Sequence, residues 1–364
     1  MAQRLILALF LILVAGGAPA DILRIATFNT GLERDGPGLL LRDILTDKDP
    51  QVAAVVQVIA QVTPDILLLQ GVDHDHDLHG LRALRDAIAR SGPHYPHIFA
   101  LPPNSGQPTG LDLNGDGRLG GGADAQGYGA FSGQGGMAIL SRYPVDRAAV
   151  RDLSGLLWRE VPGALLPMMD GKAFPSEEAQ AIQRLSSVGH WIVPVQAPGG
   201  RIGLMAFHAA SHVFDGPEDR NGRRNHDEIR LWQHVLDGAF GPAPKARFVI
   251  LGGATVDPVD GGGRKGAIRA LLADPRVRDP RPMRPGPVPP VAGAKGDPRL
   301  HTVDWPAPGP GPLRVDYVLP SADWTVRAAG VHWPPRGVPG HEAAMTASAH
   351  RLIWVDLETD PREP

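Results

Sequence analysis

Apolar residues follow strand-like and helix-like patterns in turn along the chain, and this gives the order of the elements. Residues 22–28 form an apolar run that ends at Asn29, which is typical of a buried strand. Asp49 followed by Pro50 predicts a helix start, and the valines after it recur at helical spacing. Residues 66–69 are apolar on both faces, as in a strand that is covered on both sides. The chain therefore opens in the order strand, helix, strand.

The same patterns continue to the C-terminus. A helix is predicted over residues 78–90, ending before Gly92, and Asn225 is predicted to cap another that precedes a shorter one over 265–273. Further strands are predicted over residues 137–140, 189–195, 202–207, 247–251, 314–319 and 352–357. Strands and helices in this alternation indicate an α/β fold.

Two long loops interrupt the pattern, a glycine-rich one over residues 102–135 and a proline-rich one over 279–312. The composition of the second predicts an extended surface excursion without buried strands or helices. Apolar strands resume after each loop, so neither is a linker between domains. We therefore predict a single domain over residues 21–364, although the length alone would also allow two.

The first twenty residues differ from the rest. Arg4 is followed by an apolar run over residues 5–15 and then by Ala18-Pro19-Ala20, which predicts a secretory signal peptide over residues 1–20. A membrane anchor is the alternative, but the run is shorter than the roughly 20 residues that a spanning helix needs. We expect a secreted or periplasmic protein without stable membrane association after cleavage.

Composition excludes several classes of site and partner. The chain has no cysteine, which excludes disulfides and thiolate metal sites. Its 36 basic and 39 acidic residues create no overall positive field, so any contact with nucleic acid would be local. Nothing in the sequence indicates an oligomeric state.

Seven segments, in the same order along the chain, resemble the endonuclease/exonuclease/phosphatase family. They are LRIATFN, PDILLLQ, GMAILSRYP, LMAFH, FVILGG, RVDYVL and SAHRL. The resemblance implies a four-layer α/β sandwich, in which two packed mixed β-sheets are flanked by helices and the site lies at the strand ends. It also implies metal-dependent hydrolysis of a phosphodiester or phosphomonoester, with Mg²⁺ or Mn²⁺ as the cofactor. The expected partner is a phosphate-containing small molecule or a nucleic acid.

Four residues match catalytic positions of the family motifs. The resemblance implies that Asn29 helps to arrange the metal site and that His208 contacts the phosphoryl oxygens. It also implies that Asp316 orients His350 through a hydrogen bond, since a carboxylate fixes the tautomer of an imidazole in this way.

Other motif positions depart from the family. Gly71 replaces a glutamate that is a metal ligand, Gly253 and Thr255 replace the polar residues of a Gly-Asp-x-Asn motif, and Ala349 replaces an aspartate. The loss of three carboxylates weakens a site for a hard cation and makes the pocket more favourable to an anion. Two hypotheses remain: a hydrolase whose metal ligands are displaced, and a catalytically degenerate exported protein that binds a phosphorylated ligand.

Carboxylates that could replace the missing metal ligands can be sought on the same faces of the strands. Residues two apart on a strand share a face, so Asp73 could replace the carboxylate lost at Gly71, and Asp257 has the parity of Gly253. Residues 73–77 also alternate aspartate with histidine, a string that either binds metal or forms a polar loop.

Arginines near the predicted histidine suggest how a phosphate could be bound. Arg220, Arg223 and Arg224 follow His208 in the sequence and could bind substrate phosphate through bidentate contacts. A solvated loop held by salt bridges is the alternative, because acidic residues surround them in the sequence.

The glycine-rich loop contains the first half of a calcium-binding motif. Asp112, Asn114 and Asp116 have the spacing of the first three oxygen ligands. Position twelve is Ala123 rather than glutamate, and Asp124 could substitute for it. The segment 112–124 is predicted to be either a structural calcium site or a metal-free turn.

Overall fold

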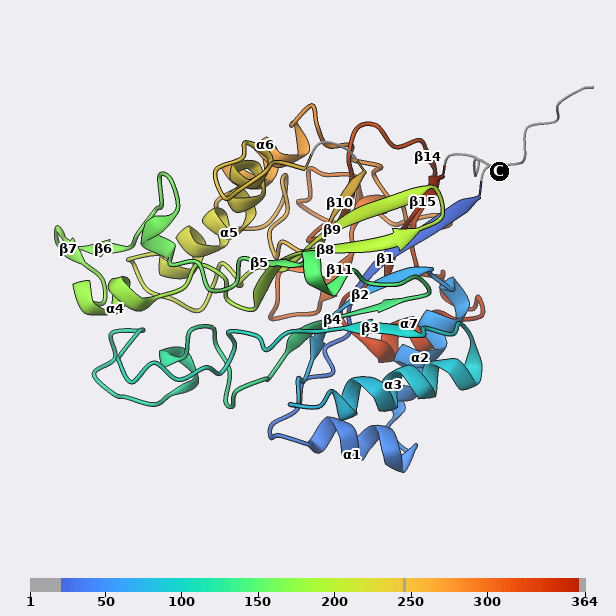
Figure 1. Cartoon of the computed structure of the whole chain (residues 1–364), viewed down its shortest axis with the longest axis horizontal. Coiled ribbons are helices and arrows are strands. Elements are labelled where there is room, and N and C mark those ends of the chain that lie inside the picture. The colour runs from blue at the N-terminus through green and yellow to red at the C-terminus, as the bar shows by residue number, and fades with distance from the viewer. Residues whose placement is uncertain (1–20, 245–246, 360–364) are drawn as a thin grey trace, which may run out of the picture.

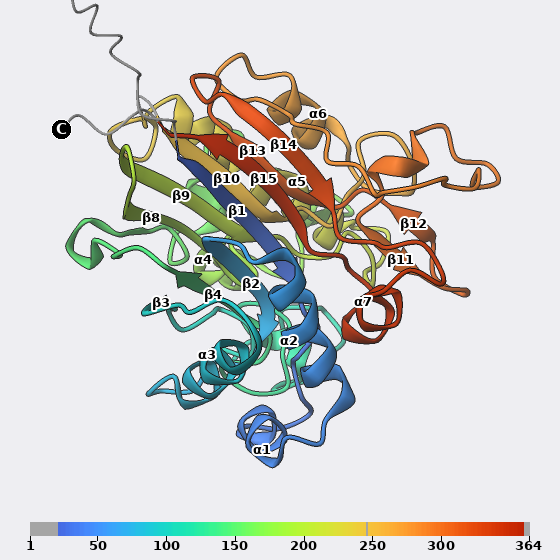
Figure 2. The same ribbon diagram turned by 90° about the vertical axis from the view of Figure 1, so that its right-hand side faces the viewer.

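Two β-sheets pack face to face at the centre of the protein, and helices cover their outer faces (Figure 1, Figure 2). The computed structural model describes residues 21–244 and 247–359. The predicted signal peptide lies outside the described residues.

One sheet has six strands. In spatial order they are β14 (Val326–Val331), β15 (Ile353–Glu358), β1 (Ile22–Asn29), β2 (Ile66–Val72), β4 (Gly136–Ser141) and β3 (His97–Phe99). The other sheet has five, namely β13 (Asp316–Pro320), β10 (Phe248–Gly253), β9 (Gly200–His208), β8 (Gly189–Ala197) and β5 (Arg151–Asp152). Within these sheets β1 runs parallel to β2 and β9 parallel to β10, while the other neighbours are antiparallel.

Each sheet has its own helical cover. The six-stranded sheet packs against α1 (Leu39–Thr46), α2 (Pro50–Val62), α3 (His79–Ser91) and α7 (His341–Ala347). The five-stranded sheet packs against α5 (Arg220–Leu236) and α6 (Gly266–Leu272). The order helix, sheet, sheet, helix confirms the predicted four-layer sandwich.

Smaller elements lie in the long connections. They are α4 (Glu177–Ile182), the hairpin of β6 (Met168–Met169) and β7 (Lys172–Ala173), the hairpin of β11 (Val303–Trp305) and β12 (Gly311–Leu313), and four 3₁₀ turns at Gly122–Asp124, Arg147–Ala149, Trp158–Glu160 and Pro298–Leu300. The first hairpin and α4 lie in the part of the chain that extends away from the sheets in Figure 1.

The position of the central strands, between the helices and the other sheet, explains why their apolar residues do not alternate with polar ones. Leu23 and Ile25 of β1 face the other sheet, whereas Ala26 and Phe28 face the helices, and all four are buried. A strand covered on both faces is therefore mostly apolar and does not alternate between apolar and polar residues. The predicted cap of α2 is also confirmed, because Asp49 accepts a hydrogen bond from Val52 N at 2.8 Å.

The structure corrects the prediction for α5. This helix begins at Arg220, so Asn225 lies within it and is not its cap. The Asn225 side chain donates to Ala210 O and Ala254 O instead, each at 2.7 Å. The first turn is rich in polar residues and shows no apolar periodicity, which hid the true start.

The second correction concerns the proline-rich segment 279–312. It was predicted to contain no buried strand, but β11 pairs with β12, and Val303 is fully buried. Residues 299–305 contain no proline, and Thr302, Val303 and Trp305 are residue types that favour strands. Helices α1 and α7 and strand β14 were also not predicted.

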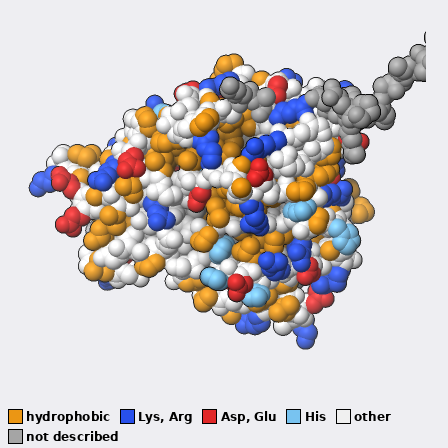
Figure 3. All heavy atoms as spheres, in the orientation of Figure 1, with side chains coloured by type: hydrophobic (Ala, Val, Ile, Leu, Met, Phe, Trp, Pro, Cys, Tyr) orange, Lys and Arg blue, Asp and Glu red, His pale blue; other side chains and the backbone are white. Residues whose placement is uncertain are grey.

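The surface carries charges of both signs. On the face shown in Figure 3, basic side chains are separated by uncharged and acidic ones, in keeping with the nearly balanced charge of the sequence. Among the described residues, no helix has the length and apolar character needed to cross a membrane.

Candidate active site

Polar residues gather where the central strands of both sheets end. In the six-stranded sheet Asn29 is the register partner of Gln70. In the five-stranded sheet Gly253 pairs with His208 on one side and with Asp316 on the other. The strand ends of the two sheets are in contact, since Gln70 Nε2 in one sheet donates to Phe207 O in the other at 3.4 Å.

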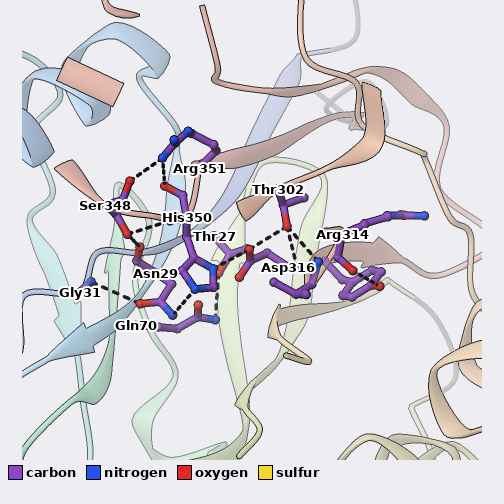
Figure 4. A network of polar contacts seen from close by, with 12 residues as sticks. Thr27, Asn29, Gly31, Gln70, Thr302, Arg314, Asp316, Ser348, His350 and Arg351 are labelled. Carbon is purple, nitrogen blue, oxygen red and sulfur yellow. Dashed lines mark hydrogen bonds and ion pairs between the residues drawn. The ribbon is translucent and has the colours of Figure 1, made fainter. Parts of the chain in front are cut away.

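An aspartate, a histidine and an asparagine form a chain of hydrogen bonds at this junction (Figure 4). Asp316 Oδ2 lies 2.8 Å from His350 Nδ1, and His350 Nε2 lies 3.4 Å from Asn29 Nδ2. Because a carboxylate accepts, His350 Nδ1 carries the proton, and Nε2 of the neutral ring is the acceptor for the Asn29 amide. The structure thus brings together three of the four predicted catalytic residues in one hydrogen-bonded line.

Three residues that were not predicted hold this line in place. The Thr302 hydroxyl donates to Asp316 Oδ2 at 2.8 Å. The Ser348 hydroxyl donates to Asn29 O at 2.8 Å and accepts from His350 N at 3.0 Å. The Trp305 ring packs edge-on against the His350 imidazole. Such contacts from neighbouring residues fix the orientation of the groups that would touch a ligand.

His208 lies on the other side of Gly253 and differs from His350 in its electrostatics. The pKa of His208 is lowered to about 4, mainly by burial and also by the nearby His350, while Asp316 acts in the opposite direction. Its Nδ1 is buried and has no hydrogen-bond partner among the described residues. His208 is therefore neutral at pH 7 and would offer a ligand an N–H dipole rather than a charge.

Gly253 is surrounded by polar groups without partners. A Cβ at this position would lie 3.6 Å from both Gln70 Oε1 and Asp316 Oδ1, and 3.3 Å from the His208 ring. Both of these oxygens are buried and accept no hydrogen bond from the described residues. Three strand ends thus direct polar atoms at a place where the chain supplies no side chain.

Gly71 is closed in a different way. Its φ is +64°, and a Cβ would lie only 2.8 Å from Glu33 Oε2 and 2.9 Å from Asn29 Oδ1 and Gly31 N. The loop after β1 is held there by a hydrogen bond of 2.7 Å from Leu32 N to Gly71 O. The Glu33 carboxylate, which sequence analysis missed, therefore lies beside Asn29 where a side chain at position 71 would begin.

Comparison with known proteins decides the family. The family model for the endonuclease/exonuclease/phosphatase family matches residues 26–350. The chain belongs to this family. No curated protein sequence matches it significantly.

Solved structures of endonuclease/exonuclease/phosphatase proteins share the fold. The protein from Beutenbergia cavernae DSM 12333 is 18% identical with a TM-score of 0.53, covering 93% of this chain and 72% of that one. The family protein from Bacteroides thetaiotaomicron is 14% identical with a TM-score of 0.51, covering 94% and 100%. These similarities support the two-sheet architecture.

Enzymes of the endonuclease/exonuclease/phosphatase family typically use divalent metal ions, so we tested whether the residues of this chain fit one. Among residues 21–244 and 247–359, no group of three or more His, Asp or Glu side chains could hold a metal ion. The Glu33 carboxylate and the Asn29 amide oxygen approach one another, but no second carboxylate joins them there. The described residues do not fit a resident cation held by the protein alone.

The two aspartates proposed as displaced ligands have structural contacts. Asp73 accepts from Arg34 N and Gly135 N, each at 3.0 Å, and its pKa is raised by burial. A β-bulge in β2 at Gly71 breaks the period of two on which the parity argument rested. Asp257 accepts from Val259 N and Arg314 N beyond the end of β10. A ligand role for Asp73 remains a prediction.

The aspartate and histidine string that begins at Asp73 leads into α3. Asp75 accepts from His79 N and Gly80 N at the start of this helix. These contacts favour the interpretation of the string as a polar loop that caps a helix.

The three predicted arginines have different surroundings. The buried Arg224 guanidinium donates to four backbone carbonyls, those of Gln126, Arg184, Leu185 and Ser186. Arg223 Nε donates to Glu218 O, whereas Arg220 lines a cavity that also contains His208. The hydrogen bonds of Arg224 hold the backbone together. The Arg220 side chain makes no hydrogen bond with the described residues, so its guanidinium is available to a ligand.

The loop with the calcium-like spacing is closed by its own backbone. Asp112 accepts from Gly115 N and Gly117 N, and Asn114 Nδ2 donates to Asp116 Oδ2. Asp124 accepts from Leu113 N and Gly121 N. These carboxylates stabilise a turn without an ion, and a calcium site at 112–124 remains a prediction.

Proposed function

We propose that this protein hydrolyses a phosphoester at the junction formed by Asn29, Asp316 and His350. Family membership supports phosphoesterase chemistry in general. The observation that carries the proposal is the line of hydrogen bonds from Asp316 through His350 to Asn29. Polar groups from both sheets meet there, next to a cavity of about 810 Å³ that His208 lines.

The residues of the line can perform acid and base chemistry on a phosphoryl group. His350 Nε2 could accept a proton from an attacking water, and Asp316 would stabilise the imidazolium that forms. The protonated ring and the Asn29 amide would donate to the phosphoryl oxygens as negative charge develops on them. The ester P–O bond breaks as the new P–O bond to water forms, and the leaving oxygen takes a proton from the solvent, to which His350 then releases the proton it accepted. The neutral His208 would add a third donor. No step is assigned to a cation, because the described residues do not fit one.

Turnover of synthetic esters tests the proposal. Purified protein from Asp21 onward would be assayed with bis(p-nitrophenyl) phosphate and p-nitrophenyl phosphate, with Mg²⁺, Mn²⁺, Ca²⁺ or chelator. We expect His350→Ala to lower kcat at least about 100-fold, the usual size of a general acid or base effect. His94→Ala replaces an exposed histidine and serves as the control. Absence of turnover by the wild type under every condition would refute a hydrolase.

Non-catalytic binding of a phosphorylated ligand is the second candidate function. Gly253 favours it, because β10 ends there without a side chain and so adds no carboxylate of its own to the unpartnered oxygens of Gln70 and Asp316. In that case the wild type would bind inorganic phosphate without turnover, and His350→Ala would weaken this binding.

We also propose that the protein is exported to the periplasm or the medium. The N-terminal pattern of residues 1–20 supports this proposal. N-terminal sequencing of the protein from a bacterial host should give a start near Asp21, whereas an intact Met1 would contradict export.

A further inference from the structure

The cavity beside the proposed phosphoryl site extends to the start of α5. His208 and Glu33 belong to its lining, and so do Tyr128, Phe214 and Arg220. A volume of about 810 Å³ exceeds what one phosphoryl group fills and lies within the range of ligand pockets. The substrate can therefore contact groups well beyond Asn29 and His350.

Arg220 is a buried charged residue of this cavity whose side chain makes no hydrogen bond or ion pair with the described residues. The residue is only 8% exposed, and its Nη1 is buried without a hydrogen-bond partner. None of the described carboxylates forms an ion pair with it. A buried charge without a partner is costly to a fold, so its presence in a ligand-sized cavity points to an anion that completes it.

The neighbouring Arg224 shows what a structural arginine looks like in the same helix. One turn further along α5, its guanidinium is satisfied by backbone carbonyls of the loop before β8 and of the glycine-rich loop. Arg224 fixes the cavity wall, whereas Arg220 has no such contacts. The two arginines therefore differ in role although they are adjacent on one helix face.

The acidic residues near Arg220 are bound elsewhere. Asp215 accepts from Asn221 N, and Glu218 Oε1 accepts from Gly216 N at 3.1 Å. Asp112 and Asp124 attract Arg220 at longer range, while their oxygens accept the backbone bonds of their own loop. These residues help to keep the guanidinium charged and leave its donors free.

The helix adds a second source of positive potential. Arg220 is the first residue of α5, which has 17 residues and no acidic residue in its first turn. Its N-cap, Asp219, makes no side-chain capping bond. The positive end of the helix dipole and the guanidinium thus act on the same end of the cavity.

We propose that Arg220 anchors a second anion subsite and that the substrate is a phosphoester bearing a further phosphate or carboxylate group. The inference rests on the proposed function, because Asn29 and His350 would hold the first phosphoryl group. Tyr128 and Phe214 are 79% and 92% exposed and line the same cavity, so they offer apolar surface to the body of the substrate that joins the two anions.

Binding measurements with two matched probes test the subsite. The first probe is the p-nitrophenyl ester of thymidine 5′-phosphate, which has one anionic group, and the second is the same ester with an added 3′-phosphate. Titration calorimetry would compare the wild type with Arg220→Gln, Arg220→Lys and His350→Ala. Arg230→Gln, on the same helix but outside the cavity lining, is the matched control.

We expect Arg220→Gln to lower the affinity for the two-phosphate probe by about 10- to 100-fold, since one charge-assisted contact is lost. Its affinity for the probe with one anionic group should not change. Arg220→Lys should recover part of the affinity, and Arg230→Gln should match the wild type. If Arg220→Gln equals Arg230→Gln with both probes while His350→Ala weakens both, the subsite is refuted and the phosphoryl site stands. If His350→Ala changes neither probe, the proposed function fails, and binding of neither probe by the wild type refutes both.

Discussion

Gly71 lies one residue before the end of β2 and Gly253 ends β10, and the structure accommodates these two glycines in opposite ways. At Gly71 the backbone is left-handed, a β-bulge interrupts β2, and Glu33 and Gly31 occupy the surrounding space. At Gly253 the φ angle lies outside the left-handed region, and a Cβ would require only a small shift of the His208 ring, which lies 3.3 Å away. The glycine at position 71 is therefore required by the backbone, whereas at position 253 only the space beside His208 limits a side chain.

The difference teaches which of the two positions could accept a side chain. Around Gly253 the buried oxygens of Gln70 and Asp316 have no hydrogen-bond partner among the described residues. Around Gly71 the Glu33 carboxylate lies where a side chain would begin. A polar side chain could therefore be introduced at Gly253 more easily than at Gly71.

Replacement of each glycine by alanine tests this comparison most strongly. Gly71→Ala should lower the free energy of unfolding by about 3 kcal/mol, because the new Cβ meets Gly31 N and must adopt a left-handed conformation. Gly253→Ala should cost less than about 1 kcal/mol, since its closest contact is the His208 ring at 3.3 Å. Urea denaturation measures both, and equal losses would contradict the comparison.

Introduction of a carboxylate at the end of β10 is expected to have the next largest effect. In Gly253→Asp the new charge lies beside Asp316, which should lower stability by about 1–3 kcal/mol in the presence of chelator. Mn²⁺ or Mg²⁺ should restore it, because a cation would offset the repulsion between the two carboxylates. Thermal unfolding with and without the cation measures this.

The uncharged variant Gly253→Asn separates charge from size in that experiment. It should be less destabilised in chelator and should not respond to the cation. A cation effect of the same size in both variants would show that the ion acts elsewhere.

Sequence patterns were sufficient for the framework because the strands are covered on both faces. Such strands appear as continuous apolar runs, and the motif residues Asn29, His208 and Asp316 mark their ends. The pairing of Asp316 with His350 came from the family resemblance, since 34 residues separate them and no periodicity connects them.

The missed residues depend on contacts that have no periodic signal. Glu33 reaches Gly71 because a bulge and a hydrogen-bonded loop bring them together. Thr302 lies within the proline-rich stretch 279–312, so composition predicted a surface segment there, although the Thr302 hydroxyl donates to Asp316. Parity along β2 suggested Asp73, and the same bulge removed the basis for it.

A pH titration of stability sharpens the β10 side of the comparison. His208 is neutral in the folded state because burial lowers its pKa to about 4, while the unfolded chain binds a proton near pH 6.5. Between these values the unfolded state binds more protons, so stability falls as the pH drops from about 6.5 to 4, by at most about 1.4 kcal/mol per pH unit. In His208→Gln this slope should be shallower, whereas the exposed His94→Gln should retain it.

Urea midpoints at pH 7.5 and pH 5 measure that difference. The buried His190, whose pKa burial lowers to about 3, contributes the same sign in every variant. An unchanged slope in His208→Gln would mean that His208 binds protons equally in the folded and unfolded states, so that its pKa is not lowered in the folded protein.

The smallest expected effect concerns the Glu33 carboxylate, which lies beside Gly71 of β2. Glu33 lines the cavity and is exposed, so its charge should repel a phosphate only weakly and in a manner that salt screens. Glu33→Gln should tighten the binding of inorganic phosphate by about two- to fivefold at low salt. Addition of roughly 0.5 M salt should remove this gain, because it screens the repulsion between Glu33 and the phosphate. Asp35→Asn replaces an exposed acid in the same loop that does not line the cavity, and it should change binding less. Because Glu33 lies beside Asn29, a gain confined to Glu33→Gln would place the bound phosphate at the junction of the two sheets, and equal gains in both variants would place it outside.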